Sequence, residues 1–180
     1  MRVERHGLDW LGVLNVARLT QNKKPLTEEP SEAWKKKLIL SRHSPLRTIQ
    51  FFVVSEAPGF VCTHLARHQY QSCQPFVGTA RTDIMKTTER PPDTAIRPYA
   101  LFLNADSYLD IYEQRSCMKA SYETRLEVES IRYEIQHIEP LIAELSFRPC
   151  EKYGRCNEFE PCGYMTTSLY HINRQKYLGV

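Results

Sequence analysis

The residues best suited to chemistry lie in one short segment, from Leu65 to Arg81. The segment carries Arg67 and His68 near its start, and Thr79 two residues before its end. Arginine, histidine and hydroxyl groups at this density suit a phosphate, or a flat ring that exchanges hydrogen bonds. The pattern therefore predicts the nucleotide and cofactor site of an enzyme.

The same segment has a simpler interpretation when it is taken alone. Arg67 and His68 would then be a solvated helix end. His64 lies three and four residues before them, on the same face of a predicted helix, and is as consistent with a partly buried helix histidine as with a ligand contact. Ser72 also has two interpretations: a hydroxyl at the end of the helix, or a contact in the site.

Bulk properties indicate one globular domain. The chain has 180 residues, 42% of them hydrophobic, and a net charge of +3. This charge is too small to indicate a duplex nucleic-acid binder, and no nucleic-acid partner is expected. No apolar run approaches the roughly 20 residues that span a bilayer, and the amino terminus lacks an apolar signal core, so we expect a cytoplasmic protein.

Several elements that must position the site follow from hydropathy periods and turn residues. Residues 48–55 (TIQFFVVS) give the clearest strand. Residues 86–98 contain three prolines and are expected to form a loop, which could act as a lid. The predicted helices cover residues 8–20, 31–41 with Ser31 as N-cap, about 60–71, and one long element over about 104–139.

The long predicted helix carries an apolar seam that continues beyond it. Its members recur at spacings of three and four, which indicates packing against a neighbouring helix or subunit. Pro140 either kinks this helix or starts a new one. The last fifteen residues show no pattern. The seam consists of Val128, Ile131, Ile135, Ile138, Ile142 and Leu145.

Three blocks of the chain resemble the flavin-dependent thymidylate synthases (ThyX). His43-Ser-Pro-Leu resembles an H-x-[ST]-P-[FL] entry to a strand. Arg67-His-Gln with Ser72 and then Thr79-Ala-Arg resembles the signature R-H-R-x-x-S-x-N-E-x-S-x-R. Asn104-Ala-Asp with Arg115, followed by Ala120-Ser-Tyr-Glu-Thr-Arg, resembles the family's asparagine-led helix. Including a weaker block at residues 13–20, the similarity extends to about Leu145.

The resemblance implies a fold and an activity. The fold would be a single α+β domain with a central, mostly antiparallel sheet flanked by helices. Residues 1–149 would form the catalytic domain, and residues 150–180 a cysteine-containing extension packed on the same domain. The activity would be methylation of dUMP to dTMP with methylene-tetrahydrofolate and NADPH, through FAD, in a homotetramer whose sites draw residues from several subunits.

The resemblance also assigns roles to individual residues. Arg67 and Arg115 would be catalytic, with Arg115 on the uracil carbonyls, where a guanidinium also stabilises the enolate formed when the pyrimidine reacts. Asn104 and Arg115 are three helical turns apart and so share one face of the predicted helix. Cofactor contacts would come from Ser44, Arg67, His68, Gln69, Gln74, Asn104 and Asp110. Substrate contacts would come from His64, Arg67, Thr79, Arg81 and Arg115.

The chain departs from the family pattern at several positions. Gln69 replaces the signature's third residue, an arginine, and Gln74-Pro75 replaces its Asn-Glu pair. Arg47 stands where glutamate is usual. Only 22 residues separate Arg81 from Asn104, where the family has a longer insertion with another phosphate-binding arginine. Arg90 or Arg97 could substitute for it, and the compact form suggests a phage-type or divergent relative.

Six cysteines in a chain without an export signal indicate thiols or metal ligands rather than disulfides. Cys150, Cys156 and Cys162 recur every six residues, so a structural zinc with Cys117 or a histidine as fourth ligand is one interpretation. The spacing is not that of a zinc ribbon, and the other interpretation is that the cysteines cluster by chance.

Two further functions stay open beside methylation of dUMP. One is a related one-carbon transfer, such as hydroxymethylation of a pyrimidine nucleotide. The other is a nucleotide-binding or zinc-stabilised protein that kept the fold and lost the flavin. Bound flavin separates an enzyme from a binding protein, and product mass separates the two reactions.

Overall fold

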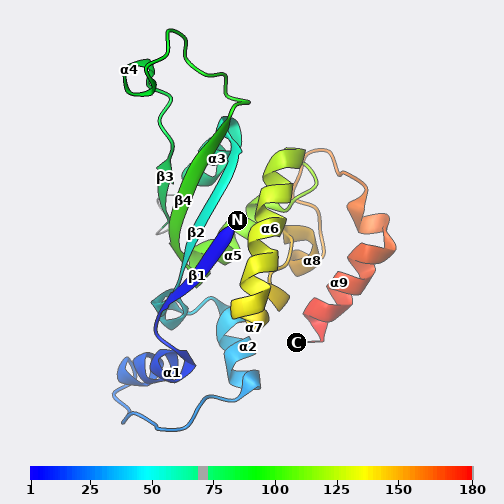
Figure 1. The fold of residues 1–180 in the computed structure, drawn as a ribbon. Coiled ribbons are helices and arrows are strands. Elements are labelled where there is room, and N and C mark those ends of the chain that lie inside the picture. The colour runs from blue at the N-terminus through cyan, green and yellow to red at the C-terminus, as the bar shows by residue number, and fades with distance from the viewer. Residues whose placement is uncertain (69–72, 180) are drawn as a thin grey trace.

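A four-stranded antiparallel sheet forms the centre of the computed structural model, which describes residues 1–68 and 73–179. Its strands lie in the order β1 (Arg2–Gly7), β2 (Ile49–Pro58), β4 (Ile96–Asn104) and β3 (Cys73–Val77). Figure 1 shows the sheet standing beside a layer of helices. The predicted fold class, an α+β domain with a mostly antiparallel sheet flanked by helices, is confirmed.

The long pairing of β2 with β4 organises the sheet. Its register runs from Gln50 opposite Asn104 to Pro58 opposite Ile96. Alternate residues of both strands, such as Phe51 and Leu101, are fully buried and point toward the helices. The strongly β-prone run predicted at residues 48–55 is therefore the centre of the core.

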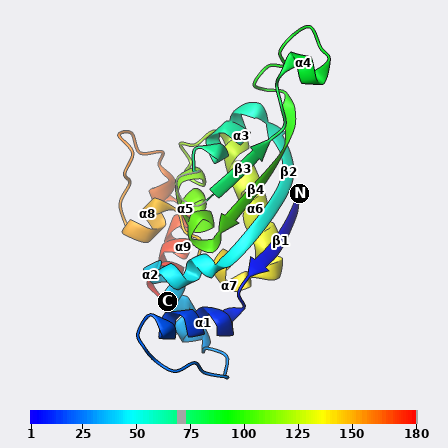
Figure 2. The same ribbon diagram turned by 90° about the vertical axis from the view of Figure 1, so that its left-hand side faces the viewer.

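Three helices cover one face of the sheet: α3 (Gly59–Ala66), α5 (Ala105–Arg115) and α6 (Tyr122–Ile138). In Figure 2 the strands lie in front and α6 is seen behind them. The opposite face carries Phe52, Val54, Phe76 and Phe102, which are partly or fully exposed. An antiparallel sheet with one covered face shows this alternation.

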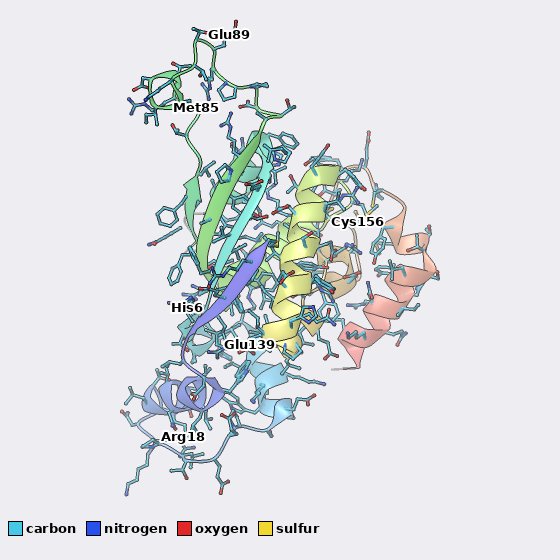
Figure 3. The ribbon with its side chains drawn as sticks, in the orientation of Figure 1. His6, Arg18, Met85, Glu89, Glu139 and Cys156 are labelled. Carbon is cyan, nitrogen blue, oxygen red and sulfur yellow. The ribbon has the colours of Figure 1, made fainter. Side chains whose placement is uncertain are left out.

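The remaining elements surround this core. Residues 78–95 between β3 and β4 project from the body as an arm, which contains α4 (Thr82–Met85) and carries Met85 and Glu89 near its tip (Figure 3). Among the described residues, no helix combines the length and apolar character needed to cross a membrane. The other elements are α1 (Trp10–Leu19), α2 (Glu32–Ser41), η1 (Ser44–Thr48), α7 (Pro140–Glu144), α8 (Pro149–Tyr153), η3 (Tyr164–Thr166) and α9 (Ser168–Leu178).

The single long helix predicted over residues 104–139 is wrong. Two helices, α5 and α6, occupy this range, and residues 116–121 turn the chain between them. Ser116 is the C-cap of α5, and the Ser121 hydroxyl accepts a hydrogen bond from the amide of Thr124 at the start of α6. A serine N-cap can start a new helix without proline or glycine. The apolar seam packs within the chain, with Val128, Ile131 and Ile135 buried.

Other boundaries also differ from the prediction. The expected loop at 86–98 ends earlier, because β4 begins at Ile96. The helix expected over 60–71 ends at Ala66. The last fifteen residues, for which the sequence predicts no element, contain the whole of α9. Pro140 starts α7, which decides between the two alternatives considered for it.

A buried ion pair ties the amino-terminal strand to the helical layer. Glu139, at the junction of α6 and α7, is only 6% exposed. Its carboxylate accepts hydrogen bonds from the Arg5 guanidinium and, at 3.1 Å, from the Trp10 indole. Both carboxylate oxygens are therefore satisfied, which offsets the cost of burying the charge.

Replacing Glu139 with glutamine is expected to lower the free energy of unfolding by about 2 kcal/mol, because it leaves Arg5 partly buried without its counter-charge. Urea denaturation followed by circular dichroism measures this loss. Glu123→Gln, at an exposed position of α6, serves as the control and should change stability little. Equal losses in both variants would show that the Arg5–Glu139 pair does not stabilise the fold.

Candidate functional site

Two strand–helix units build the candidate site. β2 ends at Pro58 and α3 begins at Gly59, while β4 ends at Asn104 and α5 begins at Ala105. Because β2 and β4 are antiparallel, the two helices start at opposite ends of the sheet, and both pack on β2 and β4. Their carboxyl ends, which carry Arg67 and Arg115, therefore approach each other.

A direct hydrogen bond joins the two units. Nε of Arg115 donates to Nε2 of His68 over 3.1 Å. His68 is 4% exposed, directly beyond the end of α3, and its Nε2 must be unprotonated to accept this bond. The sequence predicted both residues in the site, but not their contact. His68 holds the Nε edge of the Arg115 guanidinium, which fixes the direction of its two terminal amino groups.

Arg67 and Arg115 are neighbouring cations at the carboxyl ends of α3 and α5. No carboxylate among the described residues lies within ion-pair distance of either, whereas Arg5, Arg42 and Arg148 pair with acidic side chains. Burial and the charge of Arg67 both lower the pKa of Arg115. Two neighbouring cations without counter-ions form a site for an anion or for electron-rich carbonyl groups.

His64 belongs to the same cluster. Its Nδ1 lies 2.9 Å from Oγ1 of Thr124, which in turn lies 2.7 Å from the Ser121 hydroxyl. Partial burial, Arg115 and Arg67 all lower the pKa of His64. No role is predicted for Thr124 from the sequence, although it lies in the block at 120–125 that carries the family resemblance. This threonine orients His64 from the first turn of α6.

Two other residues predicted to bind the cofactor lie away from Arg115, Asn104 at the amino end of α5 and Asp110 in its middle. Asn104 is buried and serves as the N-cap of α5, with its side-chain oxygen accepting from the amide and hydroxyl of Ser107. Asp110 lies 3.6 Å from Arg42, which also binds Asp106. These side chains are engaged in holding α5 against the segment that follows α2.

Ser44 lines a cavity of about 340 Å³ between α1, α2 and η1. Trp34, Lys37 and Ser41 also line it. The volume falls in the range of small-molecule sites, roughly 300–1,000 Å³. An aromatic ring, a cation and two hydroxyls are suited to part of a nucleotide.

The predicted phosphate-binding residues lie on the arm. The hydroxyl of Thr79 accepts a hydrogen bond from the amide of Arg81. Arg81 binds Asp83 through Nε at 3.1 Å and Nη2 at 2.6 Å, and both side chains are mostly exposed. Arg81 and Arg90 line the same shallow depression on the surface of the arm. A phosphate would therefore have to replace Asp83 as the partner of Arg81.

Two further residues predicted from the sequence, Gln74 and Arg97, lie elsewhere in the structure. Gln74 is exposed on β3, on the face of the sheet away from the helices, because the adjacent Cys73 is buried. Arg97 packs at the base of the arm, where Nη2 donates toward the carbonyls of Pro91 and Pro92. It holds the arm, which leaves Arg90 as the arginine that could assist Arg81. Gln69 lies outside the described residues.

The predicted site is thus divided among separate places in one chain. Cys73 pairs with Leu103 next to Asn104, whereas Val77 pairs with Tyr99, close to where the arm begins. These pairs are four residues apart, or about 13 Å along an antiparallel strand. Thr79 and Arg81 lie farther along the chain in the same direction. Within one chain, the arm residues and Asn104 do not converge.

Comparison with known proteins identifies the fold but no family. No profile of a known protein family matches the chain, and no curated protein sequence does. Among solved structures, a UMP/dUMP methylase, PolB from Streptomyces cacaoi, bound with 5-Br dUMP, superposes with a TM-score of 0.59. The match covers 79% of this chain and 94% of that protein at 14% sequence identity. At this identity the likeness establishes a shared fold.

The cluster geometry predicts a measurable change in His64. Positive charges nearby disfavour its protonated form, so removing the charge of Arg115 in Arg115→Gln should raise the pKa of His64. Titration of the His64 ring signals by NMR tests this. Arg174→Gln, on α9, is the matched control and should leave the value unchanged. An unchanged pKa in Arg115→Gln would contradict the proposed proximity of these groups.

Proposed function

We propose that the protein is a flavin-dependent enzyme that methylates dUMP at the pyrimidine ring, with methylene-tetrahydrofolate and NADPH as co-substrates. The observation that carries this proposal is the pair of arginines without acidic partners, Arg67 and Arg115, of which Arg115 is held by His68. The fold shared with a UMP/dUMP methylase supports the same class of substrate.

Arg115 is suited to bind and activate the pyrimidine. With Nε held by His68, its two terminal amino groups make no hydrogen bond to the described residues and can address two neighbouring acceptors. The uracil ring offers carbonyl oxygens as such acceptors. As an enolate develops on the ring, the same fixed charge stabilises it more strongly than it stabilises the ground state.

The residues present fit a flavin dinucleotide in two places. The cavity beside Ser44 offers an indole, a cation and hydroxyls to a nucleotide moiety, and its volume is that of part of a large cofactor. Near Arg115, buried His68 and exposed Arg67 offer groups for a flat ring with carbonyl oxygens. FAD, when bound, would supply the redox chemistry, while the protein supplies binding, orientation and charge.

We further propose that the complete site forms between subunits of a homotetramer. The arm residues Thr79 and Arg81 do not converge with Asn104 in one chain. The face of the sheet away from the helices exposes apolar side chains that a second copy can cover, including Phe76 at 59% exposed. A cytosolic location completes the proposal, since all six cysteines are free thiols.

Ligand binding gives the first test. The purified protein, mixed with FAD, should show flavin absorbance bands that shift when dUMP is added. In Arg115→Ala, the loss of a desolvated charged contact of about 2–3 kcal/mol should weaken dUMP binding roughly 30- to 150-fold. Isothermal titration calorimetry with dUMP measures this change.

The control for this test is Arg155→Ala, which removes an exposed arginine from the segment after α8 and should leave dUMP affinity unchanged. A colourless protein that ignores FAD would exclude the flavoenzyme. If dUMP binds Arg115→Ala as tightly as the unaltered protein, the assignment of Arg115 is wrong. Mass spectrometry of the product then distinguishes a methyl from a hydroxymethyl group.

Mixed oligomers test the composite site. Arg81→Ala and Arg115→Ala should each reduce turnover. If one subunit supplies Arg81 and another supplies Arg115, co-expressed variants should regain activity, because some sites in the mixed tetramer contain both intact residues. Activity of the mixture that equals the mean of the two variants would show that each site lies within one chain. Sedimentation velocity checks that tetramers form.

A further inference from the structure

Four cysteines from distant parts of the sequence line one small cavity. Cys117 follows α5, Cys150 lies in α8, and Cys156 and Cys162 lie in the segment after α8. The cavity has a volume of about 130 Å³. This is below the roughly 300 Å³ expected for an organic ligand, but ample for a metal ion. The described residues that line it include no histidine, which favours Cys117 as the fourth thiol.

Hydrogen bonds made by residues around the cavity bring the segments that carry these cysteines together. The Tyr164 hydroxyl donates to Glu151 over 2.5 Å, which links the neighbours of Cys150 and Cys162. Nε of Arg148 donates to the carbonyl of Ser116 over 2.9 Å, which brings Cys117 toward Cys150. Glu151 is 2% exposed and also accepts from Asn173 and from the amide of Arg148, so this support is rigid.

The segment that carries Cys156 and Cys162 has few restraints of its own. Residues 155–162 make no backbone–backbone hydrogen bond with the rest of the described chain. Two side-chain contacts of 3.8 Å hold it to the turn after α5, from Cys117 to Glu158 and from Lys119 to Glu160. Phe159 within it is fully exposed, so apolar burial does not fix it. Figure 3 shows Cys156 on this outer segment.

We propose that Cys117, Cys150, Cys156 and Cys162 bind one structural Zn²⁺ ion. Four thiols would each lose a proton to solvent and form four Zn–S bonds, giving the tetrahedral, soft-ligand site that zinc prefers. In the structure the thiols surround the cavity without meeting: no three metal-binding side chains among the described residues are grouped closely enough to hold an ion. Binding would draw residues 155–162 inward and fix them.

A divalent ion bound by the four cysteines would replace their protons, so the thiolates would not be placed together without a counter-charge.

Metal content of the full chain tests the proposal. The protein is purified with a non-thiol reductant, incubated with Zn²⁺ and desalted. It should then retain about one zinc per chain, measured by elemental mass spectrometry. The double variant Cys156→Ser/Cys162→Ser should retain at most about one tenth of this zinc content. Cys62→Ala/Cys73→Ala removes the same number of thiols from the core and should retain the metal.

Cobalt substitution of the unaltered protein gives a second readout that needs no variant. Tetrahedral thiolate coordination should produce a sulfur-to-cobalt charge-transfer band and intense visible bands. Absence of zinc and of these bands in reduced protein would overturn the proposal. The proposal would also be overturned if the protein held no metal and its four cysteines formed disulfides. Zinc retained by the Cys156→Ser/Cys162→Ser variant would overturn it as well.

Discussion

The arrangement of the site depends on a match between the length of the central strand pair and the lengths of two helices. β2 and β4 overlap from Gln50–Asn104 to Pro58–Ile96, eight residue steps or about 27 Å. The eight residues of α3 and the eleven of α5 span about 12 and 16 Å. Helices that start at opposite ends and return over the same strands therefore meet end to end, and the Arg115–His68 bond lies at that meeting point.

Two cations at this junction would repel each other, and the helices reduce that cost. Arg67 and Arg115 lie at the carboxyl ends of α3 and α5, where unsatisfied carbonyl groups carry partial negative charge. The protein can thus hold them together without a carboxylate, which would otherwise occupy their guanidinium groups. This distinguishes them from Arg81, whose guanidinium is already bound by Asp83.

The sequence was informative where local chemistry decides the structure. The strand at β2 and the N-cap Ser31 follow from residue types and spacing. The roles of His68 and Arg115 rest on the family resemblance and stay predictions. Strands β1 and β3 could not be predicted in this way. β1 is rich in charged residues and β3 contains Pro75, so each forms a strand only because it pairs with β2 or β4. The Arg115–His68 contact depends on helix lengths and sheet register together. The division of the predicted ligands among core, cavity and arm is likewise a property of the three-dimensional fold.

Glu151 links the carboxyl-terminal residues to the region around Arg115. It anchors Tyr164 and Asn173, while the adjacent Arg148 binds the carbonyl of Ser116, the residue that directly follows Arg115. Residues 150–180 contain none of the predicted nucleotide ligands, yet they supply the acceptor that orients Arg148. An expression boundary placed at residue 149 would therefore cut through the scaffold around Arg115, and a shortened chain would lack the contacts that orient Arg148.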